Sequence, residues 1–309
     1  MGPPYLGADE LRDALPMLAA IDALDAAFSG ELPTAPQRSH YDVGEGDLLL
    51  MPAWSEELGT GVKLVTAARD NPARGLPLIH GIYVLFERAT LRPIALLDGA
   101  ALTGIRTAAV SGVATRHLAR SDARTLCVIG GGVQGTAHIE AMAAVLPALE
   151  SVWCLSRGAE SARRLEERGR KLGLRAEIEP AGAVANADVV CTCTTSNSPL
   201  FDGSLLSAGT HVNAVGAYRP DARELDDLAM SRAKIFVERK ATALHEAGDL
   251  RLPIDSGVIG PEEITELGDV AGGGASGRTS AEDITIFKSV GVAFEDLVVA
   301  SAAVAAHEM

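Results

Sequence analysis

The sequence predicts an α/β protein in which a parallel-sheet domain is combined with a second, α+β domain. Two observations carry this prediction. In the middle of the chain, continuous apolar strands alternate with helices, which is the pattern of a parallel sheet covered on both faces. At residues 127–138, the stretch CVIGGGVQGTAH joins the first of these strands to a helix, as in a Rossmann-type domain. We place the Rossmann-type domain at residues 115–285 and build the other domain from residues 1–114 and 286–309.

The N-terminal part of the chain is expected to contain helices and antiparallel strands. Residues 8–30 have apolar side chains at helical spacing and end at Gly30, which predicts one helix. Residues 102–118 return to a helical pattern. Between these helices, short apolar runs separated by turns are typical of antiparallel strands. These runs lie at residues 47–54, 61–68, 79–87 and 93–99.

The middle of the chain alternates between strands and helices. Helices are expected at residues 133–146 and 160–173. Residues 181–187 are expected to form a helix or a loop. Strands are expected at residues 125–131, 151–157, 176–179, 188–194, 210–217 and 233–238. From residue 281 to the terminus, the apolar pattern predicts a final helical segment. That segment is expected to complete the domain that the N-terminal residues begin.

Composition and charge exclude several classes of function. The chain has 309 residues, 47% of them hydrophobic, and a net charge of −14, which disfavours nucleic acid and anionic membranes as partners. No apolar run approaches the roughly 20 residues of a membrane span, and the N-terminus lacks the features of a signal peptide. The four cysteines lie in apolar strand-like runs and predict buried thiols rather than a metal site. We therefore expect a cytoplasmic protein without a metal.

The glycine-rich stretch predicts a dinucleotide site. Gly130, Gly132 and Gly135 match the G-x-G-x-x-G pattern at the end of a strand and the start of a helix. The first glycine permits a tight turn, the second lets the backbone approach a pyrophosphate, and the third lets helix and strand pack closely. We expect Val133 and Gln134, at the N-terminus of that helix, to contribute to the same phosphate site. The alternative is an ordinary glycine-rich turn.

The end of the second strand bears on which nicotinamide cofactor is bound. NAD-binding domains usually place an acid there for the ribose 2′-hydroxyl, whereas this chain has Ser156 and Arg157. A guanidinium matches phosphate oxygens with paired donors, so these residues favour the 2′-phosphate of NADP(H) over NAD(H). Arg163 and Arg164 follow at one to two helical turns and are candidates to assist. The alternative is that Arg157 is a solvated surface charge.

Five blocks of the chain, in order, resemble the ornithine cyclodeaminase/mu-crystallin family. They are DGAALTGIRTAAVSGVATRHLA, GGGVQGTAHIEAM, HVNAVGAYRPDARELD, HEAGDL and ITIFKSVGVAFEDLVVA. The resemblance implies a homodimer with a Rossmann domain for the nicotinamide cofactor. It also implies that the other domain makes the dimer contact and much of the substrate pocket. The expected substrate is a small α-amino or α-imino carboxylate.

The resemblance assigns roles to individual residues. Arg38, Lys63 and Arg106 match positions that bind the substrate or the cofactor. Without the resemblance, a surface charge is the default interpretation for each, although Lys63 lies in an apolar strand where a lone ammonium is costly. Matching positions near the cofactor are Thr103, Thr107, Val215, Ser289 and Gly291. The two threonines are otherwise ordinary helix-surface residues.

Two further acidic residues and one basic residue are assigned less specifically. Glu246 and Asp249, in the HEAGDL block, are candidates to contact the site. Lys288 is interpreted as a charge at the start of the last helix.

The sequence also departs from the cyclodeaminase pattern. Ornithine cyclodeaminases carry an aspartate where this chain has Tyr218 and a glutamate where it has Leu49. The segment around Tyr218 is instead similar to the mu-crystallin branch, which reduces ketimines. We therefore expect NADPH-dependent reduction of a cyclic ketimine carboxylate, with Arg38 and Arg106 on the carboxylate, Lys63 as hydrogen-bond or proton donor, and Tyr218 lining the pocket. The alternatives are an ornithine cyclodeaminase or related amino-acid dehydrogenase, and a non-catalytic NADP-binding protein.

Overall fold

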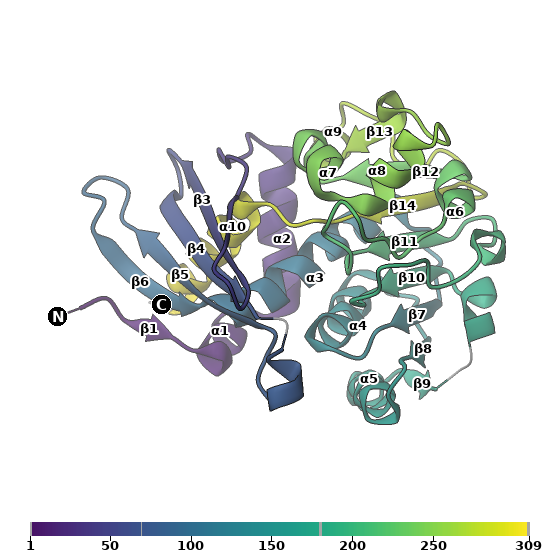
Figure 1. The fold of residues 1–309 in the computed structure, drawn as a ribbon, viewed down its shortest axis with the longest axis horizontal. Helices are drawn as coiled ribbons and strands as arrows, with labels where there is room; N and C mark the ends of the chain where they lie inside the picture. Colours follow the sequence, from purple (N-terminus) through teal and green to yellow (C-terminus); the bar gives the residue numbers. More distant parts are fainter. Residues whose placement is uncertain (1, 69, 179–180, 308–309) are drawn as a thin grey trace. The chain divides into compact units, whose positions relative to one another are not determined.

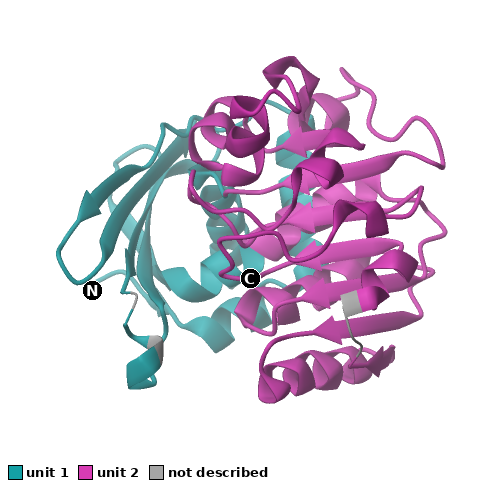
Figure 2. Ribbon diagram, turned by 45° about the vertical axis from the view of Figure 1, so that its right-hand side comes forward, with its two compact units in different colours: residues 1–106, 291–309 teal, residues 107–290 magenta. Residues whose placement is uncertain are grey.

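The computed structural model describes residues 2–68, 70–178 and 181–307 (Figure 1). The chain separates into two compact units, residues 1–106 with 291–309 and residues 107–290 (Figure 2). The first unit is α+β and the second is built on a parallel sheet, so the predicted fold class is confirmed. The chain passes between the units after Arg106 and after Val290. The assignment of substrate binding and dimerisation to the first unit stays a prediction.

The first unit contains a six-stranded sheet in the order β1-β6-β5-β4-β3-β2. Neighbouring strands from β2 to β6 are antiparallel, and β1 runs parallel to β6. The strands are β1 (Tyr5–Leu6), β2 (Ser39–Asp42), β3 (Asp47–Ser55), β4 (Gly59–Ala67), β5 (Ile79–Phe86) and β6 (Pro93–Asp98). Its helical elements are α1 (Ala8–Ala14), α2 (Met17–Ser29), the 3-10 helix η1 (Pro72–Arg74), the first part of α3 (Gly99–Leu118) and α10 (Ala293–His307).

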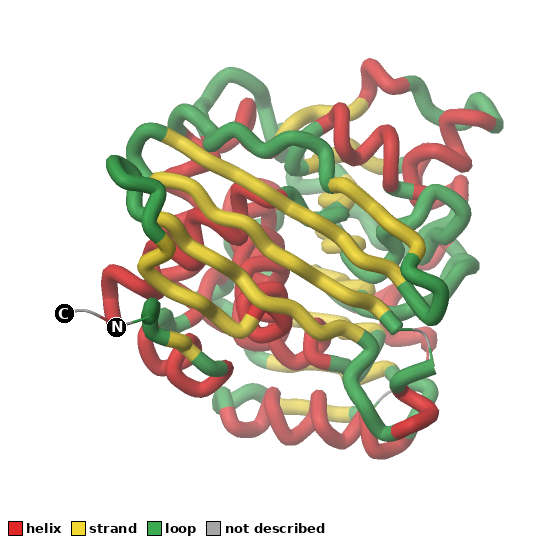
Figure 3. Tube along the Cα trace, turned by 60° about the vertical axis from the view of Figure 1, so that its left-hand side comes forward, coloured by secondary structure: helices red, strands yellow, loops and turns green. Residues whose placement is uncertain are grey.

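The two faces of this sheet are built differently. On the inner face, Met51, Lys63 and Tyr83 lie opposite one another on β3, β4 and β5 and are buried. Helix α10 packs on these three strands and on α2, where Phe28 and Phe294 meet edge to face at 5.2 Å. On the outer face, none of the helices that the structure describes in this unit lies in front of the strands (Figure 3). The inner face therefore forms the core of the unit.

The prediction of a single helix at residues 8–30 is wrong in one respect, because these residues form two helices. Leu15 and Pro16 lie between α1 and α2, and Pro16 is the N-cap of α2. Proline lacks a backbone N–H and its ring clashes with the preceding helical turn, so a helix does not continue through it. The apolar spacing continues across the break because both helices contribute to the same core.

The second unit contains an eight-stranded sheet in the order β13-β12-β14-β11-β10-β7-β8-β9, and all neighbouring strands are parallel. The strands are β7 (Thr125–Ile129), β8 (Ser151–Leu155), β9 (Arg175–Glu177), β10 (Val189–Thr192), β11 (His211–Ala214), β12 (Ala233–Val237), β13 (Ile264–Glu266) and β14 (Ile284–Lys288). The α-helices are α4 (Val133–Val145), α5 (Ala159–Lys171), α6 (Asp227–Ser231), α7 (Lys240–Glu246), α8 (Gly248–Asp255) and α9 (Leu267–Ala271). The 3-10 helices are η2 (Ala181–Asn186), η3 (Gly203–Leu205) and η4 (Pro261–Glu263). The third predicted strand ends at Glu177, and residue 179 lies outside the described residues.

Helical elements cover both faces of this sheet. On one face, Asn213 of β11 donates a hydrogen bond to Thr115 of α3 at 2.9 Å, so α3 packs there, and α4 contacts β7 and β10. On the other face, Val190 and Val212 belong to an apolar cluster that includes residues of η2, α6 and α7. Strands buried on both faces need to be apolar throughout, which explains the continuous apolar runs in the sequence.

The prediction of a helix from residue 281 onwards is partly wrong. Residues 284–288 form β14, which pairs with β11 and β12, and the helix α10 begins only at Ala293. ITIFK is rich in β-branched and aromatic residues, which favour a strand, and all five residues are buried. The apolar side chains of residues 284–288, which the prediction assigns to a helix, belong to a central strand of the sheet. The predicted helical positions 308 and 309 lie outside the described residues.

Candidate active site

The glycine loop lies between β7 and α4 in the second unit. Gly130 adopts a left-handed conformation with φ of 115°, and a Cβ there would lie 2.4 Å from the carbonyl oxygen of Cys193. A Cβ on Gly135 would lie 1.9 Å from the carbonyl oxygen of Gly130. At Gly132, the N-cap of α4, a Cβ would meet no described atom within 4 Å. The first and third glycines are thus required by close packing, while the second leaves the helix N-terminus approachable.

The predicted phosphate-reading residues follow β8. Ser156 is half-buried and Arg157 is exposed, and among the residues that the structure describes none forms an ion pair with Arg157. Arg164, on α5, donates to Glu160 at 2.8 Å, to Ser161 Oγ at 2.7 Å and to the carbonyl oxygen of Gly131 at 3.3 Å. Arg164 therefore braces the glycine loop, whereas Arg157 remains accessible to solvent.

Other predicted residues of the second unit lie at or beyond the carboxyl ends of its strands. Val215 donates its backbone N–H to Thr192, and Ser289 donates its own to Ala214, both at 3.0 Å. Thr107 is buried on α3. Val133, at the first turn of α4, is 70% exposed, and Tyr218, in the loop after β11, is 42% exposed. In open parallel sheets, ligands bind outside the carboxyl ends of the strands.

A buried ion pair forms the centre of the first unit's polar cluster. Lys63, on β4, is 1% exposed, and its Nζ donates to the two carboxylate oxygens of Asp296 at 2.7 and 2.8 Å. The same Nζ donates to Thr103 Oγ1 at 3.1 Å. Because a buried ammonium is costly without a partner, the fully buried carboxylate of Asp296 explains how Lys63 is tolerated in an apolar strand.

Two arginines belong to the same unit. The Nη1 of Arg106 lies 2.9 Å from Glu295 Oε2, and its Nε lies 3.4 Å from Asp296 Oδ1. Arg38 donates a hydrogen bond to the carbonyl oxygen of Gly291 at 3.3 Å. Gly291 has φ of 75°, and a Cβ there would lie 2.2 Å from Arg106 Nη1. The guanidinium of Arg106 therefore packs directly against Gly291.

The ionisation of Lys63 is shifted by this environment. Burial lowers the pKa of Lys63 to about 8, and the cations Arg106 and Arg38 lower it as well. Asp296 opposes the shift, because an adjacent anion favours the ammonium. Lys63 is accordingly an ammonium at neutral pH, but one that releases its proton more readily than a solvent-exposed lysine does.

The structure divides the predicted residues between the units. Arg38, Lys63, Thr103, Arg106 and Gly291 lie in the first unit, and the others lie in the second. Thr103 and Gly291 were predicted near the cofactor. Thr103 accepts from Lys63 and donates to the carbonyl oxygen of Gly99, and Gly291 lies against Arg106 and accepts from Arg38. Their role at the cofactor, like that of each other site residue, stays a prediction.

Two acids that the sequence analysis did not single out pair with the cations of the first unit, and one residue that it did single out lies elsewhere than predicted. Glu295 and Asp296 are buried and pair with Arg106 and Lys63. Two adjacent acids in an otherwise apolar helix are a signal that partners of opposite charge are needed. Lys288 does not begin a helix as predicted. It ends β14 and pairs with buried Asp249 at 3.0 Å.

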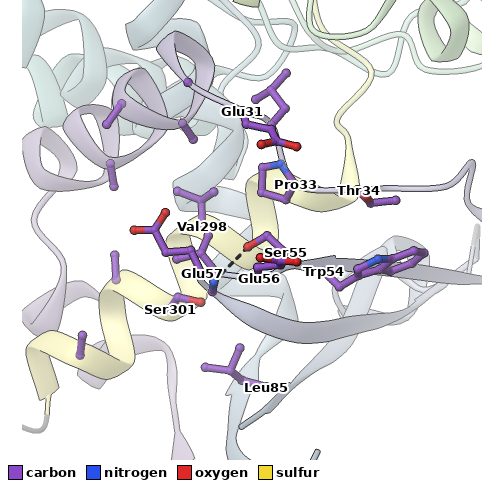
Figure 4. Close-up of a pocket in the computed structure, with 18 of the residues that line it drawn as sticks. Glu31, Pro33, Thr34, Trp54, Ser55, Glu56, Glu57, Leu85, Val298 and Ser301 are labelled. Carbon is purple, nitrogen blue, oxygen red and sulfur yellow. Dashed lines mark hydrogen bonds between the residues drawn. The ribbon is translucent and has the colours of Figure 1, made fainter. Parts of the chain in front are cut away.

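A cavity of about 1000 Å³ lies in the first unit, beside the second half of α10 (Figure 4). Glu31, Glu56 and Glu57 are among its lining residues, together with apolar side chains such as Leu85 and Val298. None of the predicted site residues lines this cavity. Within the described residues, every helix is too short or too polar to span a bilayer, and no group of three His, Cys, Asp or Glu side chains is arranged to hold a metal ion.

The fold places the protein in the class of Rossmann-type proteins that carry an additional α+β unit, here one with buried cations. The chain belongs to the ornithine cyclodeaminase/mu-crystallin family, whose model matches residues 8–306. The resemblance identified from the sequence blocks is therefore confirmed.

Three relatives show how closely the chain matches known proteins. It is 39% identical over 306 residues to a Δ1-pyrroline-2-carboxylate reductase of Bacillus cereus, covering 96% of this chain and 94% of the relative. The structure of Thermococcus litoralis Δ1-pyrroline-2-carboxylate reductase in complex with NADH and L-proline matches with a TM-score of 0.94 and 33% identity, over 98% of this chain and 96% of that one. An archaeal alanine dehydrogenase dimer with bound NAD matches with a TM-score of 0.93 and 31% identity, over 99% and 96%. The reductase names agree with the ketimine reductase branch of the family.

Proposed function

We propose that the protein reduces the C=N bond of a cyclic ketimine carboxylate, such as Δ1-pyrroline-2-carboxylate or Δ1-piperideine-2-carboxylate, to the cyclic amino acid. The observation that carries the proposal is the buried cluster of Lys63, Arg106 and Asp296, in a chain with relatives named for this reduction. The reaction needs a hydride for the imine carbon, a proton for the imine nitrogen and cations for the carboxylate.

The glycine loop fits a nicotinamide dinucleotide. The left-handed Gly130, the close packing at Gly135 and the approachable N-terminus of α4 are the features that a pyrophosphate requires. In this proposal, backbone N–H groups of Val133 and Gln134 bind the phosphates. The nicotinamide ring supplies the hydride when the cofactor is bound.

We propose NADPH as the preferred cofactor because of the chemistry at the end of β8. An acid in this place would repel a 2′-phosphate, whereas exposed Arg157 and half-buried Ser156 offer a positive charge and a hydroxyl. The T. litoralis relative was solved with NADH. The preference in this chain rests on Ser156 and Arg157.

In the proposed reaction, Arg38 and Arg106 bind the substrate carboxylate. Lys63 would give a proton to the imine nitrogen, and a bound nicotinamide would supply the hydride for the adjacent carbon, so that the C=N bond becomes a CH–NH bond. Asp296 and Thr103 hold the Nζ of Lys63 in place. With a pKa of about 8, Lys63 carries that proton at neutral pH and can transfer it.

Cyclodeamination of a diamino acid fits these residues less well. That reaction needs a base for ring closure and an anion for the distal ammonium, and the two family positions for such acids hold Tyr218 and Leu49. Reduction of a preformed cyclic imine requires neither group. This difference is why reduction is proposed and cyclodeamination is not.

We also propose that the protein is a homodimer formed through the outer face of the first unit's sheet. Val62 and Leu64 of β4 alternate with buried residues, lie opposite Val84 and Ile82 of β5, and are only half-buried. An apolar sheet face that is left half-exposed favours association. The archaeal alanine dehydrogenase relative is a dimer.

A panel of substrates and cofactors tests the proposed function. Five- and six-membered cyclic imino acids are each assayed with NADPH and with NADH by following oxidation of the cofactor. Turnover of at least one imino acid, faster with NADPH, is the expected result. Cofactor binding without turnover of any imino acid would identify a cofactor-binding protein instead and would contradict the proposal.

A further inference from the structure

A buried polar cluster lies at the carboxyl ends of β10, β11 and β14 in the second unit. Glu224, Asp249 and Lys288 form it, and all three are fully buried. Glu224 lies in the segment before α6, Asp249 in the first turn of α8, and Lys288 at the end of β14. Burying three charged groups together is costly unless each is well paired, so the arrangement calls for a reason beyond packing.

The carboxylate of Glu224 joins the ends of two neighbouring strands. Its Oε1 accepts from the backbone N–H and the hydroxyl of Thr194 at 2.8 and 2.7 Å. Its Oε2 accepts from the hydroxyl of Thr192 at 2.8 Å and from the backbone N–H of Gly216 at 2.7 Å. Thr192 is the last residue of β10, Thr194 lies in the turn after it, and Gly216 follows β11. The turns after these two strands are therefore held together by a single side chain.

The close approach of these turns is visible at Gly216. A Cβ there would lie 2.1 Å from the carbonyl oxygen of Thr194 and 2.5 Å from Glu224 Oε1. Only glycine fits between them, so the three segments are packed around the carboxylate.

The backbone of Glu224 is fixed in turn by Asp249. Asp249 Oδ1 accepts from the N–H groups of Glu224 and Leu225 at 2.8 and 2.9 Å. Its Oδ2 lies 3.0 Å from Lys288 Nζ, so the ion pair ties this segment to the end of β14. The cluster thus links the carboxyl ends of three adjacent strands.

These strand ends lie on one side of the glycine loop. In the strand order, β8 and its Arg157 lie on one side of β7, and β10, β11 and β14 lie on the other. Because Gly130 packs against Cys193, the turn after β10 adjoins the glycine loop directly. A dinucleotide with its pyrophosphate at the loop and its 2′-phosphate at Arg157 must extend its nicotinamide half over the turns that Glu224 holds.

We propose that Glu224 is a positioning residue for the nicotinamide half of the cofactor, an inference that rests on the proposed function. The carboxylate does not touch the cofactor but sets the backbone at Thr194 and Gly216. An amide cannot replace it. Each carboxylate oxygen accepts from one backbone N–H. A backbone N–H can only donate, whereas a hydroxyl can turn and accept instead. Whichever way a glutamine is turned, its NH2 group faces one of the two N–H groups.

The test compares the two halves of the cofactor in the variant Glu224→Gln. Titration calorimetry measures the Kd of NADPH and of 2′,5′-ADP, which carries the adenosine half and the 2′-phosphate without nicotinamide. We expect the Kd of NADPH to rise about tenfold, because the hydrogen bonds that hold the two turns are disrupted. The Kd of 2′,5′-ADP should stay within about twofold of the value for the unaltered protein. The matched control is Glu282→Gln, an exposed glutamate of the same unit, which should change neither value.

A purely structural role would give a different result. Equal weakening of both ligands, or no change in either, would overturn the inference. If Glu224→Gln does not fold, Thr192→Val removes one hydroxyl donor from the carboxylate at a fully buried position and should give the same selective effect at about threefold. Failure of the proposed function is separable, because the unaltered protein would then bind both ligands without reducing an imino acid.

Discussion

Arg157 is the residue on which cofactor preference depends in this account. Replacing Arg157 with Asp turns an attractive charge beside the 2′-phosphate into a repulsive one. Losing such a charge-assisted contact costs about 1.5–3 kcal/mol, which corresponds to a roughly tenfold to hundredfold loss of kcat/KM for NADPH. Activity with NADH should change little. Steady-state assays with both cofactors measure this, and equal losses would show that Arg157 does not contact the phosphate.

The control for this variant lies at the opposite, amino-terminal end of the neighbouring strand. Arg175 is exposed at the first residue of β9, whereas Arg157 follows the last residue of β8. Arg175→Asp makes the same change in net charge and should leave the NADPH to NADH ratio unchanged.

Arg38 is proposed to bind the substrate carboxylate. Arg38→Ala should remove about 2–5 kcal/mol of transition-state stabilisation, because a desolvated carboxylate loses a charged partner. The kcat/KM for imino acids should fall accordingly. The Kd of NADPH, measured by fluorescence titration, should stay nearly constant. Arg92→Ala, which removes an exposed arginine of the same unit, serves as the control. Loss of NADPH binding in Arg38→Ala would reassign the residue to the cofactor.

The proton of Lys63 predicts a pH dependence. The pKa of Lys63 is lowered to about 8, so the fraction of ammonium falls as the pH rises through that value. The kcat/KM for imine reduction should therefore decline above pH 8, and that for oxidation of the cyclic amino acid should increase. Lys63→Arg keeps its charge throughout this range, so its residual activity should lack the decline. A pH profile of Lys63→Arg that matches the unaltered protein would exclude Lys63 as the proton donor.

For individual residues, the sequence identified the cations of the site but not the acidic residues that pair with them. Lys63 was expected to need a partner because of its apolar strand, but that partner, Asp296, is 233 positions away along the chain. Pairing over that distance depends on how α10 packs on β4, which local spacing does not contain. Glu295 and Asp296 were overlooked for the same reason.

Among the elements, those with a strong local signal were predicted well. The strand–glycine loop–helix unit of β7 and α4 and the antiparallel strands β3 to β6 were found within about two residues of their observed ends. β14 was not recognised, because an apolar run of five residues next to a longer apolar helix has no periodicity of its own. Its misassignment also misplaced Lys288, whose burial depends on the strand and on Asp249.

The outer face of the first sheet carries the prediction for assembly. Val62→Glu places a charge on the apolar face of β4 without entering the core, because its side chain points away from α10. We expect the dimer to dissociate, as measured by sedimentation velocity at micromolar concentration, because an unpaired buried charge opposes association. Leu172→Glu, at an exposed apolar position of the other unit, should leave the oligomeric state unchanged. A Val62→Glu protein that sediments like the unaltered one would contradict the assignment of this face.

For the whole molecule, the predicted fold class is confirmed, whereas the chemistry still rests on proposals. The family, the two-part architecture and the Rossmann-type sheet follow from motifs that are local in sequence. The choice between imine reduction and cyclodeamination follows from two positions where expected acids are replaced by Tyr218 and Leu49. That choice is the central claim of the account.

The most direct test of this claim compares two substrates in steady-state assays. Δ1-pyrroline-2-carboxylate is offered with NADPH, and ornithine is offered with the oxidised cofactor. Reduction of the cyclic imine needs only the carboxylate cations, a hydride and a proton, whereas conversion of ornithine to proline needs a base and an anion that Tyr218 and Leu49 do not supply. We predict ready reduction of the imine and very slow or no conversion of ornithine. Conversion of ornithine at a rate that rivals imine reduction would contradict the account.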